Sequence, residues 1–248
     1  MPRKTLIITD VTAMSGDNVC IAGYDDSLIC IRPVLSRGQI RKRHLFKDGD
    51  LIIFPGAKVA FNFSSPISQP PHVEDIIFEE ASIESIGRVS DRGWKELLKQ
   101  TAQKKFTDLF ALIEDRYVPP RSSGPSIGTL QPAGIPALYC SYYKDTTRPR
   151  MRILDHDGTA KDNVPITDLA FRGLFNFVMG KYKGDCEKTV KLLNKKLSDS
   201  IVYLRLGLTR PFSDAPGKYA GWCCLQVNGI HTFPDFYERD YAKWIRLE

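Results

Sequence analysis

The chain has 248 residues, of which 42% are hydrophobic and 26% charged, and its formal net charge is +6. This composition excludes a disordered chain, because enough apolar surface is present to offset the entropy lost on folding. The longest apolar stretches, at residues 51–54 and 171–179, are far shorter than the roughly 20 residues of a membrane-spanning helix. We expect a folded protein without membrane contact, whose positive charge favours an anionic partner.

The first residues and the cysteines suggest a cytoplasmic protein. Residues 1–4 lead into only three consecutive apolar residues at 6–8, which is too few for the core of a secretory signal. The cysteines form no CxxC pair, and several lie in apolar runs typical of buried strands. We therefore expect buried, reduced thiols and no structural zinc. The six cysteines are Cys20, Cys30, Cys140, Cys186, Cys223 and Cys224.

Residues 1–93 are predicted to form a small β-barrel. Runs of β-favouring residues alternate with Gly, Pro, Asp and Ser, and Gly56 marks a bulge or a corner. Several short strands with this punctuation favour a barrel over a parallel α/β sheet. The predicted strands are residues 5–10, 18–24, 28–34, 51–63 and 75–89.

A helix and a proline-rich linker are predicted at residues 94–125. Apolar residues recur at three- and four-residue steps from Trp94 to Ile113, which predicts an amphipathic helix over 94–114 with Asp91 as its cap. Five prolines between residues 117 and 136 then interrupt regular structure, because proline lacks an amide donor. This segment is the predicted boundary between two domains.

Residues 126–248 are predicted to form a second barrel with inserted helices. The order of the elements lacks the regular strand and helix alternation of a doubly wound sheet. The predicted fold is therefore mainly β with accessory helices (β/α+β), built as two small β-barrels packed or tethered together. The strand patterns cover residues 137–143, 150–154, 201–208 and 222–227, and the helical patterns cover 168–179, capped by Thr167, and 185–197.

Basic residues are concentrated in residues 32–47, a segment that suits contact with a phosphate backbone. Residues 32–47 hold six arginines and lysines and no acidic residue, and arginine presents planar donors to phosphate. A solvated loop that keeps the protein in solution is the alternative explanation. The predicted phosphate contacts of this segment are Arg32, Arg41, Lys42 and Arg43.

A second basic group has a spacing of two residues. Arg148, Arg150 and Arg152 would all lie on one face if residues 150–154 and their neighbours form a strand. Tyr142 would then supply a ring on which an unpaired base stacks. Packing of the tyrosine at the rim of the core is the alternative.

The C-terminal loops contribute two further candidate contacts. Arg210 and His231 would meet across the barrel mouth and hold an anion, since binding residues often lie on loops. In the alternative, Asp235 pairs with Arg210 inside a packed aromatic loop.

Only one compact group of acid and base residues is present. His72, Glu74 and Asp75 lie within four residues and would bind a divalent metal or act as acid and base, with Asp168 as a further candidate. Such a group after two prolines is also common on protein surfaces. The sequence contains no phosphate-binding P-loop, serine elbow, zinc-protease motif or kinase motif set. We assign no metal site and no cofactor, and we expect a binding protein rather than an enzyme.

The chain resembles the dual OB domain family, whose bacterial members look like two successive oligonucleotide-binding barrels. The resemblance implies that both predicted barrels are OB-like and that the protein binds nucleic acid. OB-like barrels also bind proteins, sugars and small ligands, and the resemblance supplies no catalytic residue. It rests on residues 19–24, 30–34, 70–75, 165–169, 207–211 and 226–235.

The leading hypothesis is a protein that binds single-stranded DNA or RNA through phosphate contacts and aromatic stacking. One alternative is a metal-dependent enzyme that processes nucleic acid and uses His72, Glu74 and Asp75. Another is a sensor of a nucleotide or a protein ligand. The residues assigned to nucleic-acid contact are Arg32, Arg41, Lys42, Arg43, Tyr142, Arg148, Arg150, Arg152, Arg210 and His231.

Overall fold

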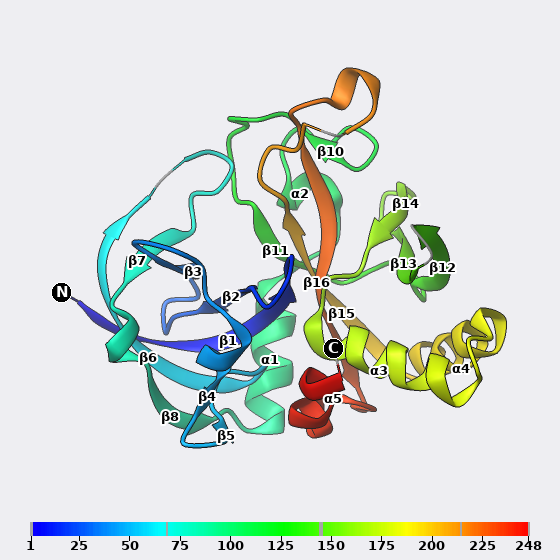
Figure 1. The fold of residues 1–248 in the computed structure, drawn as a ribbon. Coiled ribbons are helices and arrows are strands. Elements are labelled where there is room, and N and C mark those ends of the chain that lie inside the picture. The colour runs from blue at the N-terminus through cyan, green and yellow to red at the C-terminus, as the bar shows by residue number, and fades with distance from the viewer. Residues whose placement is uncertain (1, 68, 144–145, 214, 248) are drawn as a thin grey trace.

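The computed structural model describes residues 2–67, 69–143, 146–213 and 215–247 (Figure 1). Strands make up 43% of the chain and helices 25%, which confirms the predicted mainly β class with accessory helices. One barrel closes completely, whereas the second large sheet curls into a half-barrel. Within the described ranges, every helix is too short or too polar to traverse a lipid bilayer.

The closed barrel lies on the left of Figure 1. Its strands are β1 (Arg3–Ala13), β2 (Val19–Tyr24), β3 (Cys30–Leu35), β6 (Ala57–Pro66) and β7 (Asp75–Phe78). They follow the order β1-β2-β3-β7-β6, and β6 pairs back with β1 to close the ring. Strands β3 and β7 are parallel, whereas the other neighbouring pairs are antiparallel. A further strand, β8 (Glu84–Arg88), pairs with β6 outside the ring.

Short elements fill the connections of the barrel. Between β3 and β6 lie the 3-10 turn η1 (Lys42–Leu45) and a hairpin of β4 (Phe46–Lys47) and β5 (Asp50–Leu51). A second turn, η2 (Glu80–Ser82), joins β7 to β8. Leu45 is fully buried, so it anchors η1 to the barrel core.

The half-barrel is a five-stranded sheet in the order β10-β16-β15-β11-β9. Its strands are β9 (Ala102–Gln103), β10 (Tyr117–Val118), β11 (Ile127–Leu130), β15 (Ile201–Leu208) and β16 (Cys223–Phe233). Strands β15 and β16 form its long central pair. Residues 8–13 of β1 are buried throughout, because β16 and α3 (Leu169–Lys181) pack against this strand. The barrel and the half-barrel therefore share one hydrophobic core.

A three-stranded sheet stands beside the half-barrel on the right of Figure 1. It contains β12 (Ala137–Tyr143), β13 (Thr146–Leu154) and β14 (Ala160–Pro165). Next to it lie α3 and α4 (Cys186–Ser198), and α5 (Tyr241–Leu247) packs on α3. The turns η3 (Gly217–Tyr219) and η4 (Glu238–Asp240) complete the C-terminal part.

The predicted helix over 94–114 is correct only in its first half. Helix α1 (Asp91–Thr101) is followed by β9 and by the short α2 (Phe106–Leu109). Residues 102 and 103 pair with β11 in parallel, so sheet formation takes the backbone groups that a continuous helix would use. The cap of α1 is Ser90, whose side chain accepts a hydrogen bond from the Gly93 amide, and not Asp91.

Two other local predictions are also corrected. The cap of α3 is Asp168, which accepts from the Phe171 amide, whereas the Thr167 hydroxyl donates to the Val227 carbonyl. The cysteines are not all reduced, because Cys140 of β12 and Cys186 of α4 form a disulfide. The remaining four cysteines are free thiols, as predicted.

A cluster of buried polar groups joins the barrel to the half-barrel. Arg205 of β15 is fully buried, and its Nε donates to Oδ2 of Asp10 at 2.9 Å. Its Nη1 donates to the hydroxyls of Tyr24 at 2.6 Å and Thr129 at 2.9 Å. We call these four residues the polar seam. Because Asp10 and Tyr24 belong to the barrel, and Thr129 and Arg205 to the half-barrel, a buried charge pair holds the two parts in one position.

Candidate functional site

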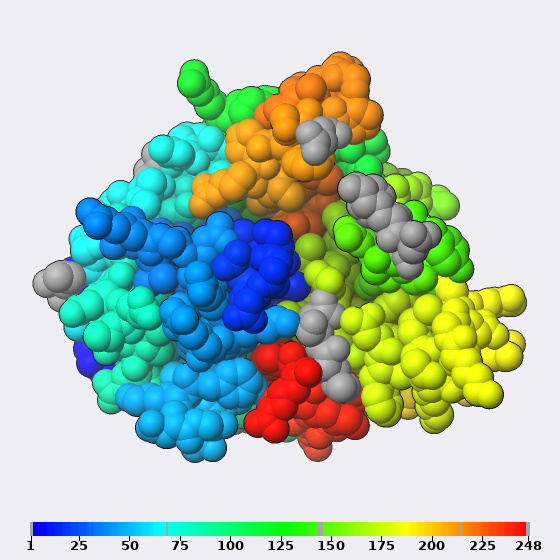
Figure 2. Space-filling model, viewed as in Figure 1, coloured from blue at the N-terminus to red at the C-terminus, as the bar shows by residue number. Residues whose placement is uncertain are grey.

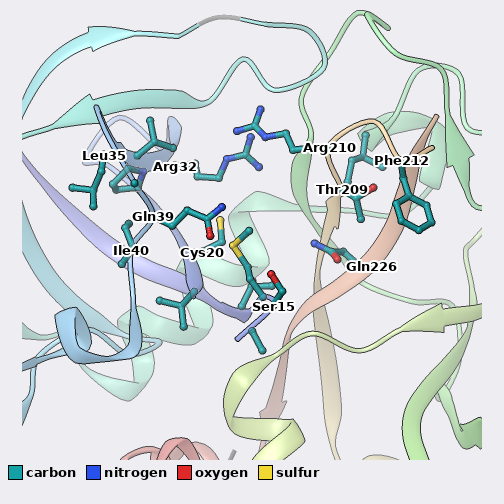
Figure 3. Close-up of a pocket in the computed structure, with 18 of the residues that line it drawn as sticks. Ser15, Cys20, Arg32, Leu35, Gln39, Ile40, Thr209, Arg210, Phe212 and Gln226 are labelled. Atoms are coloured by element: carbon teal, nitrogen blue, oxygen red, sulfur yellow. The ribbon is translucent and has the colours of Figure 1, made fainter. Parts of the chain in front are cut away.

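A hollow lies between the barrel and the end of the half-barrel. This pocket has a volume of about 710 Å³. The barrel contributes the end of β1, the β1–β2 loop, β2, β3 and residues 38–40, and the half-barrel contributes residues 208–212 and Gln226. Figure 3 shows these two sides facing each other. In Figure 2 the segment after β15 lies next to the barrel segments on the same face of the molecule.

Two arginines share one carboxylate in the wall of this pocket. The parallel pairing of β3 and β7 places Arg32 beside Asp75, and Arg32 Nε donates to Asp75 Oδ1 at 2.5 Å. From the half-barrel side, Arg210 Nη2 donates to the other oxygen, Oδ2. The side chains of Arg32 and Asp75 are 7% and 3% exposed, whereas that of Arg210 is 54% exposed. We call Arg32, Asp75 and Arg210 the arginine clasp.

The clasp keeps a positive charge and an unused donor. Two guanidinium groups face one carboxylate, so the three side chains carry a net charge of +1. The Nη2 atom of Arg32 is buried and has no hydrogen-bond partner within the described ranges. A buried donor without an acceptor is rare in folded proteins because its hydration is lost without replacement.

His72 lies next to the clasp as a neutral ring. Burial, together with the nearby charges of Arg32 and Arg210, lowers its pKa to about 3, and Asp75 and the Thr209 backbone act in the opposite direction. Both ring nitrogens are buried, and neither makes a hydrogen bond of ordinary geometry to a described residue. The imidazole therefore adds no charge to the pocket wall near neutral pH.

Glu74 points away from its neighbours and supports the half-barrel. Its carboxylate accepts from the Ser126 amide at 2.5 Å, the Ser126 hydroxyl at 2.9 Å and the Ile127 amide at 3.1 Å. These donors stand at the start of β11. The three candidate catalytic side chains His72, Glu74 and Asp75 thus have separate environments. In the part of the chain that the structure describes, no three His, Cys, Asp or Glu side chains gather around a point where a metal ion would fit.

The basic segment after the pocket remains at the surface. Arg41 and Arg43 are exposed and Lys42 is half-buried, all of them directly following the pocket-lining residues 38–40. The Arg41 amide donates to Nδ1 of His44 at 3.0 Å, which fixes the start of η1. These three cations extend the positive surface from the pocket rim outward.

The spacing of the second basic group places its side chains on one face, as predicted. On β13 the buried residues Pro149, Met151 and Ile153 alternate with the outward-facing Arg148, Arg150 and Arg152. Arg116, from the loop before β10, lies close enough to Arg150 to act on it electrostatically. Burial and the charges of Arg116 and Arg148 lower the pKa of Arg150. We call the four arginines at 116, 148, 150 and 152 the arginine face.

Two arginines of the face have neutral partners, and one has an exposed acidic partner. Arg150 Nε donates to the Ser141 hydroxyl at 3.1 Å, and Arg152 forms an exposed ion pair with Asp162 at 3.4 Å. Arg116 Nη1 donates to the Asn163 carbonyl at 2.5 Å. Tyr142, on the neighbouring strand, is 76% exposed. Tyr142 pairs with Thr147 and not with an arginine of β13, so its side chain lies on the other face of the sheet from Arg148 and Arg150. The tyrosine that shares the arginine face is Tyr139, which pairs with Arg150. The face therefore combines several cations with Tyr139, and Tyr142 does not join them as predicted.

Strand β16 connects the arginine face with the pocket. Burial raises the pKa of the Cys224 thiol, and the charges of Arg116 and Arg150 act on it in the opposite direction, so this thiol lies beside the face. Two residues further along the strand, Gln226 lines the pocket. The Cys224 amide donates to the hydroxyl of Thr209, another lining residue, at 2.8 Å. Because residues two apart share a face of a strand, the two positive regions are neighbours on the same side of β16.

His231 is a structural residue and does not reach Arg210. It is fully buried, with Nδ1 bonded to Glu238 and Nε2 at 3.0 Å from the Thr9 carbonyl. Arg210 instead belongs to the clasp, and Asp235 accepts from the backbone amides of residues 237, 238 and 239. The predicted meeting of Arg210 and His231 is therefore wrong, and so is the alternative pairing of Arg210 with Asp235.

No protein-family model matches the chain, and no curated protein sequence matches it. The closed ring β1-β2-β3-β7-β6 and the half-barrel are compatible with OB-like barrels. Membership of the dual OB domain family stays a prediction that rests on the residues quoted for it.

Proposed function

We propose that the protein binds single-stranded nucleic acid, DNA or RNA, across the pocket and the arginine face. The observation that carries this proposal is the position of the pocket on the barrel. OB barrels bind oligonucleotides on the face of their second and third strands and with the loops between strands 1 and 2 and between strands 4 and 5. Here the pocket is lined by β2, β3 and the β1–β2 loop. The loop between the fourth and fifth strands of the ring contains His72, beside the clasp.

The side chains around this face suit a phosphate backbone with unpaired bases. Guanidinium groups match phosphate oxygens, and exposed aromatic rings stack on bases without regard to sequence. Arg210 and the arginine face supply the guanidinium groups, which are the first of these two features. Phe212, 46% exposed at the pocket, and Tyr139, which pairs with Arg150 on the arginine face, supply the second. A single strand fits better than a duplex, because stacking requires bases that are already unpaired.

The enzyme alternative lacks support from the described residues. Both carboxylate oxygens of Asp75 accept from arginines, and those of Glu74 accept from β11. A divalent ion would have to displace these donors before it bound. We therefore retain binding, and not metal-dependent cleavage, as the proposed function.

A salt-titrated binding assay tests the proposal. Fluorescence anisotropy of a labelled single strand of DNA, the same sequence as RNA, and the duplex would be measured over a range of salt concentrations. If about six phosphates are neutralised, log K should fall against log salt with a slope of about −4 for the single strands. A flat salt dependence would exclude phosphate contacts as the source of affinity.

Matched variants separate the proposed surface from general charge. Arg148→Ala combined with Arg152→Ala should reduce the salt slope by about 1.4, since each lost phosphate contact contributes about 0.7. Arg92 and Arg246 are exposed arginines of α1 and α5, so Arg92→Ala combined with Arg246→Ala removes the same charge elsewhere. Equal losses in both pairs would show that the arginine face has no special part in binding.

A further inference from the structure

The arginine clasp is built to receive an anion and not only to stabilise the fold. Asp75 satisfies Arg32 through Nε, but the buried Nη2 of the same guanidinium has no partner within the described residues. A core arginine that serves structure alone is expected to have its donors paired, as Arg205 shows through its bonds to Asp10, Tyr24 and Thr129. The difference between the two buried arginines leaves an Arg32 donor that a bound ligand could use.

The second arginine of the clasp is placed to complete such a site. Arg210 reaches Asp75 from the half-barrel side and remains half-exposed at the pocket. In Figure 3 its guanidinium and that of Arg32 point toward each other above the pocket. Asp75 holds both groups, so their separation is fixed before any ligand arrives. Donors fixed in this way bind an anion with less loss of conformational entropy than free side chains.

The electrostatics of the clasp favour an anion, and the Glu74 carboxylate, which also acts on Arg32, reduces the positive charge available to it. The clasp has a net charge of +1, and His72 beside it is neutral because its pKa is about 3. Cys20, another lining residue, has its thiol pKa raised by burial, so it adds no negative charge near neutral pH. A phosphate monoester carries a charge of about −1.5 to −2 at pH 7 and offers several acceptor oxygens to the two forks.

The burial of Arg32 favours a terminal phosphate over a phosphodiester within a nucleic-acid strand. Its side chain is 7% exposed and its Nη2 is buried, so a phosphate reaches Nη2 only if it enters the pocket and the neighbouring side chains move apart. A phosphodiester inside a strand has a nucleotide on either side, and both would have to follow it into the pocket. A terminal phosphate or a free nucleotide enters end-on with one nucleoside.

The remaining lining suits that nucleoside. Val34, Leu35, Ile40 and Phe212 provide apolar surface. Amide and hydroxyl groups are available from Gln39, Thr209 and Gln226. The volume of about 710 Å³ falls in the range of roughly 300–1,000 Å³ of sites for small ligands.

We infer that the arginine clasp is a subsite for a phosphate monoester, carried either by the end of a nucleic-acid strand or by a free nucleotide. The inference deepens the proposed function, and its strand-end form rests on that function. Arg32 and Arg210 contact the phosphate, Asp75 positions them, and the nucleoside lies against the β2–β3 side of the pocket.

Binding of matched ligand pairs tests the inference with the full chain. Calorimetry would compare nucleoside 5′-monophosphates with the same nucleosides, and anisotropy would compare one single strand with and without a 5′- or 3′-terminal phosphate. We expect the phosphorylated member of at least one pair to bind tenfold or more tightly. We also expect Arg210→Gln to abolish this preference, while Arg92→Gln on α1 retains it. Arg32→Lys serves as the second variant, because it keeps a charge beside Asp75 and should lower the preference without unfolding the protein.

The outcomes separate the subsite from the proposed function. Equal binding of phosphorylated and unphosphorylated ligands overturns the subsite, even if single strands still bind with a steep salt dependence. A preference that survives Arg210→Gln also overturns it, because the phosphate is then held elsewhere. Binding of the monophosphate together with no binding of any strand supports the subsite and overturns the proposed function.

Discussion

Replacing Arg205 by methionine should be among the most damaging single changes in this protein. The side chain is fully buried and donates to Asp10, Tyr24 and Thr129. Arg205→Met keeps most of the apolar stem but leaves the Asp10 carboxylate, 2% exposed, without a counter-charge. Loss of one partner of a buried ion pair costs about 3–5 kcal/mol. This is a large share of the roughly 5–15 kcal/mol by which domains are stable.

Urea unfolding followed by circular dichroism would give this free energy, and calorimetry the midpoint temperature. For a chain of this size, a loss of about 3–5 kcal/mol corresponds to a midpoint lower by about 6–20 °C. Arg92→Met, on the exposed side of α1, is the matched control and should change stability by less than about 0.5 kcal/mol.

A double variant tests whether the unpaired charge is the cause. Asp10→Asn in the Arg205→Met background removes the isolated carboxylate and should recover at least about 1 kcal/mol, since directly paired residues couple by about 0.5–3 kcal/mol. If Arg205→Met behaves like Arg92→Met, or if the double variant loses the full sum of the two single losses, the seam is not held by the ion pair.

Three further predictions concern other buried groups. The pKa of His72 is lowered to about 3, so the unfolded chain binds a proton there at a higher pH than the folded chain, and stability is lost as pH falls from about 6.5 toward 3. Between pH 7 and pH 4 the protein should therefore lose about 3 kcal/mol more than His72→Asn in urea unfolding. Glu74→Ala leaves the buried donors of Ser126 and Ile127 without acceptors and should cost about 2–4 kcal/mol, while Glu74→Gln, which keeps one acceptor oxygen, should cost less in the same assay. Without a reducing agent, the denatured protein should show four reactive thiols out of six, and replacing Cys140 and Cys186 by serine should lower the free energy of unfolding by about 2–4 kcal/mol.

The sequence predicts local features of this fold well where one face of an element is buried. Residues 148–154 show this best, because apolar and basic residues alternate and the strand has one buried face and one exposed face. The mainly β class, the first three strands of the barrel and the first half of the predicted helix follow from the same kind of pattern. The predicted strand over 75–89 is instead divided into β7 and β8 by the turn η2. These features depend on neighbours in the sequence, so the residues alone carry the information.

The predictions that failed concern features that are set by contacts between segments far apart in the sequence. The period of the apolar residues continues to Ile113, yet pairing with β11 ends the helix at Thr101. Cys140 and Cys186 are 46 residues apart, and only the packing of α4 on β12 brings them together. Arg210 meets Asp75 and not Asp235, because the segment after β15 contacts the first residue of β7, which is 135 residues away in the sequence.

The pocket itself could not be predicted, because its two sides come from parts of the chain that are far apart in the sequence. Arg32 and Arg210, which line the pocket, stand out in the sequence by their charge. Thr209 and Gln226 stand out only as members of the segments 207–211 and 226–235 on which the family resemblance rests. Arg205, in contrast, does give a signal in the sequence. It is a single charge inside the apolar run 201–208, and arginine is almost never fully buried without a partner. Such a position predicts a buried acidic residue elsewhere, here Asp10.

Strand β16 fixes the distance between the arginine face and the pocket. With a rise of about 3.4 Å per residue, the position of Cys224 beside the arginine face and that of Gln226 in the pocket are about 7 Å apart. Deletion of one residue between them would turn every following side chain to the opposite face and separate the two regions. Any ligand that contacts both therefore meets them at one fixed interval, so the strand would select ligands by length.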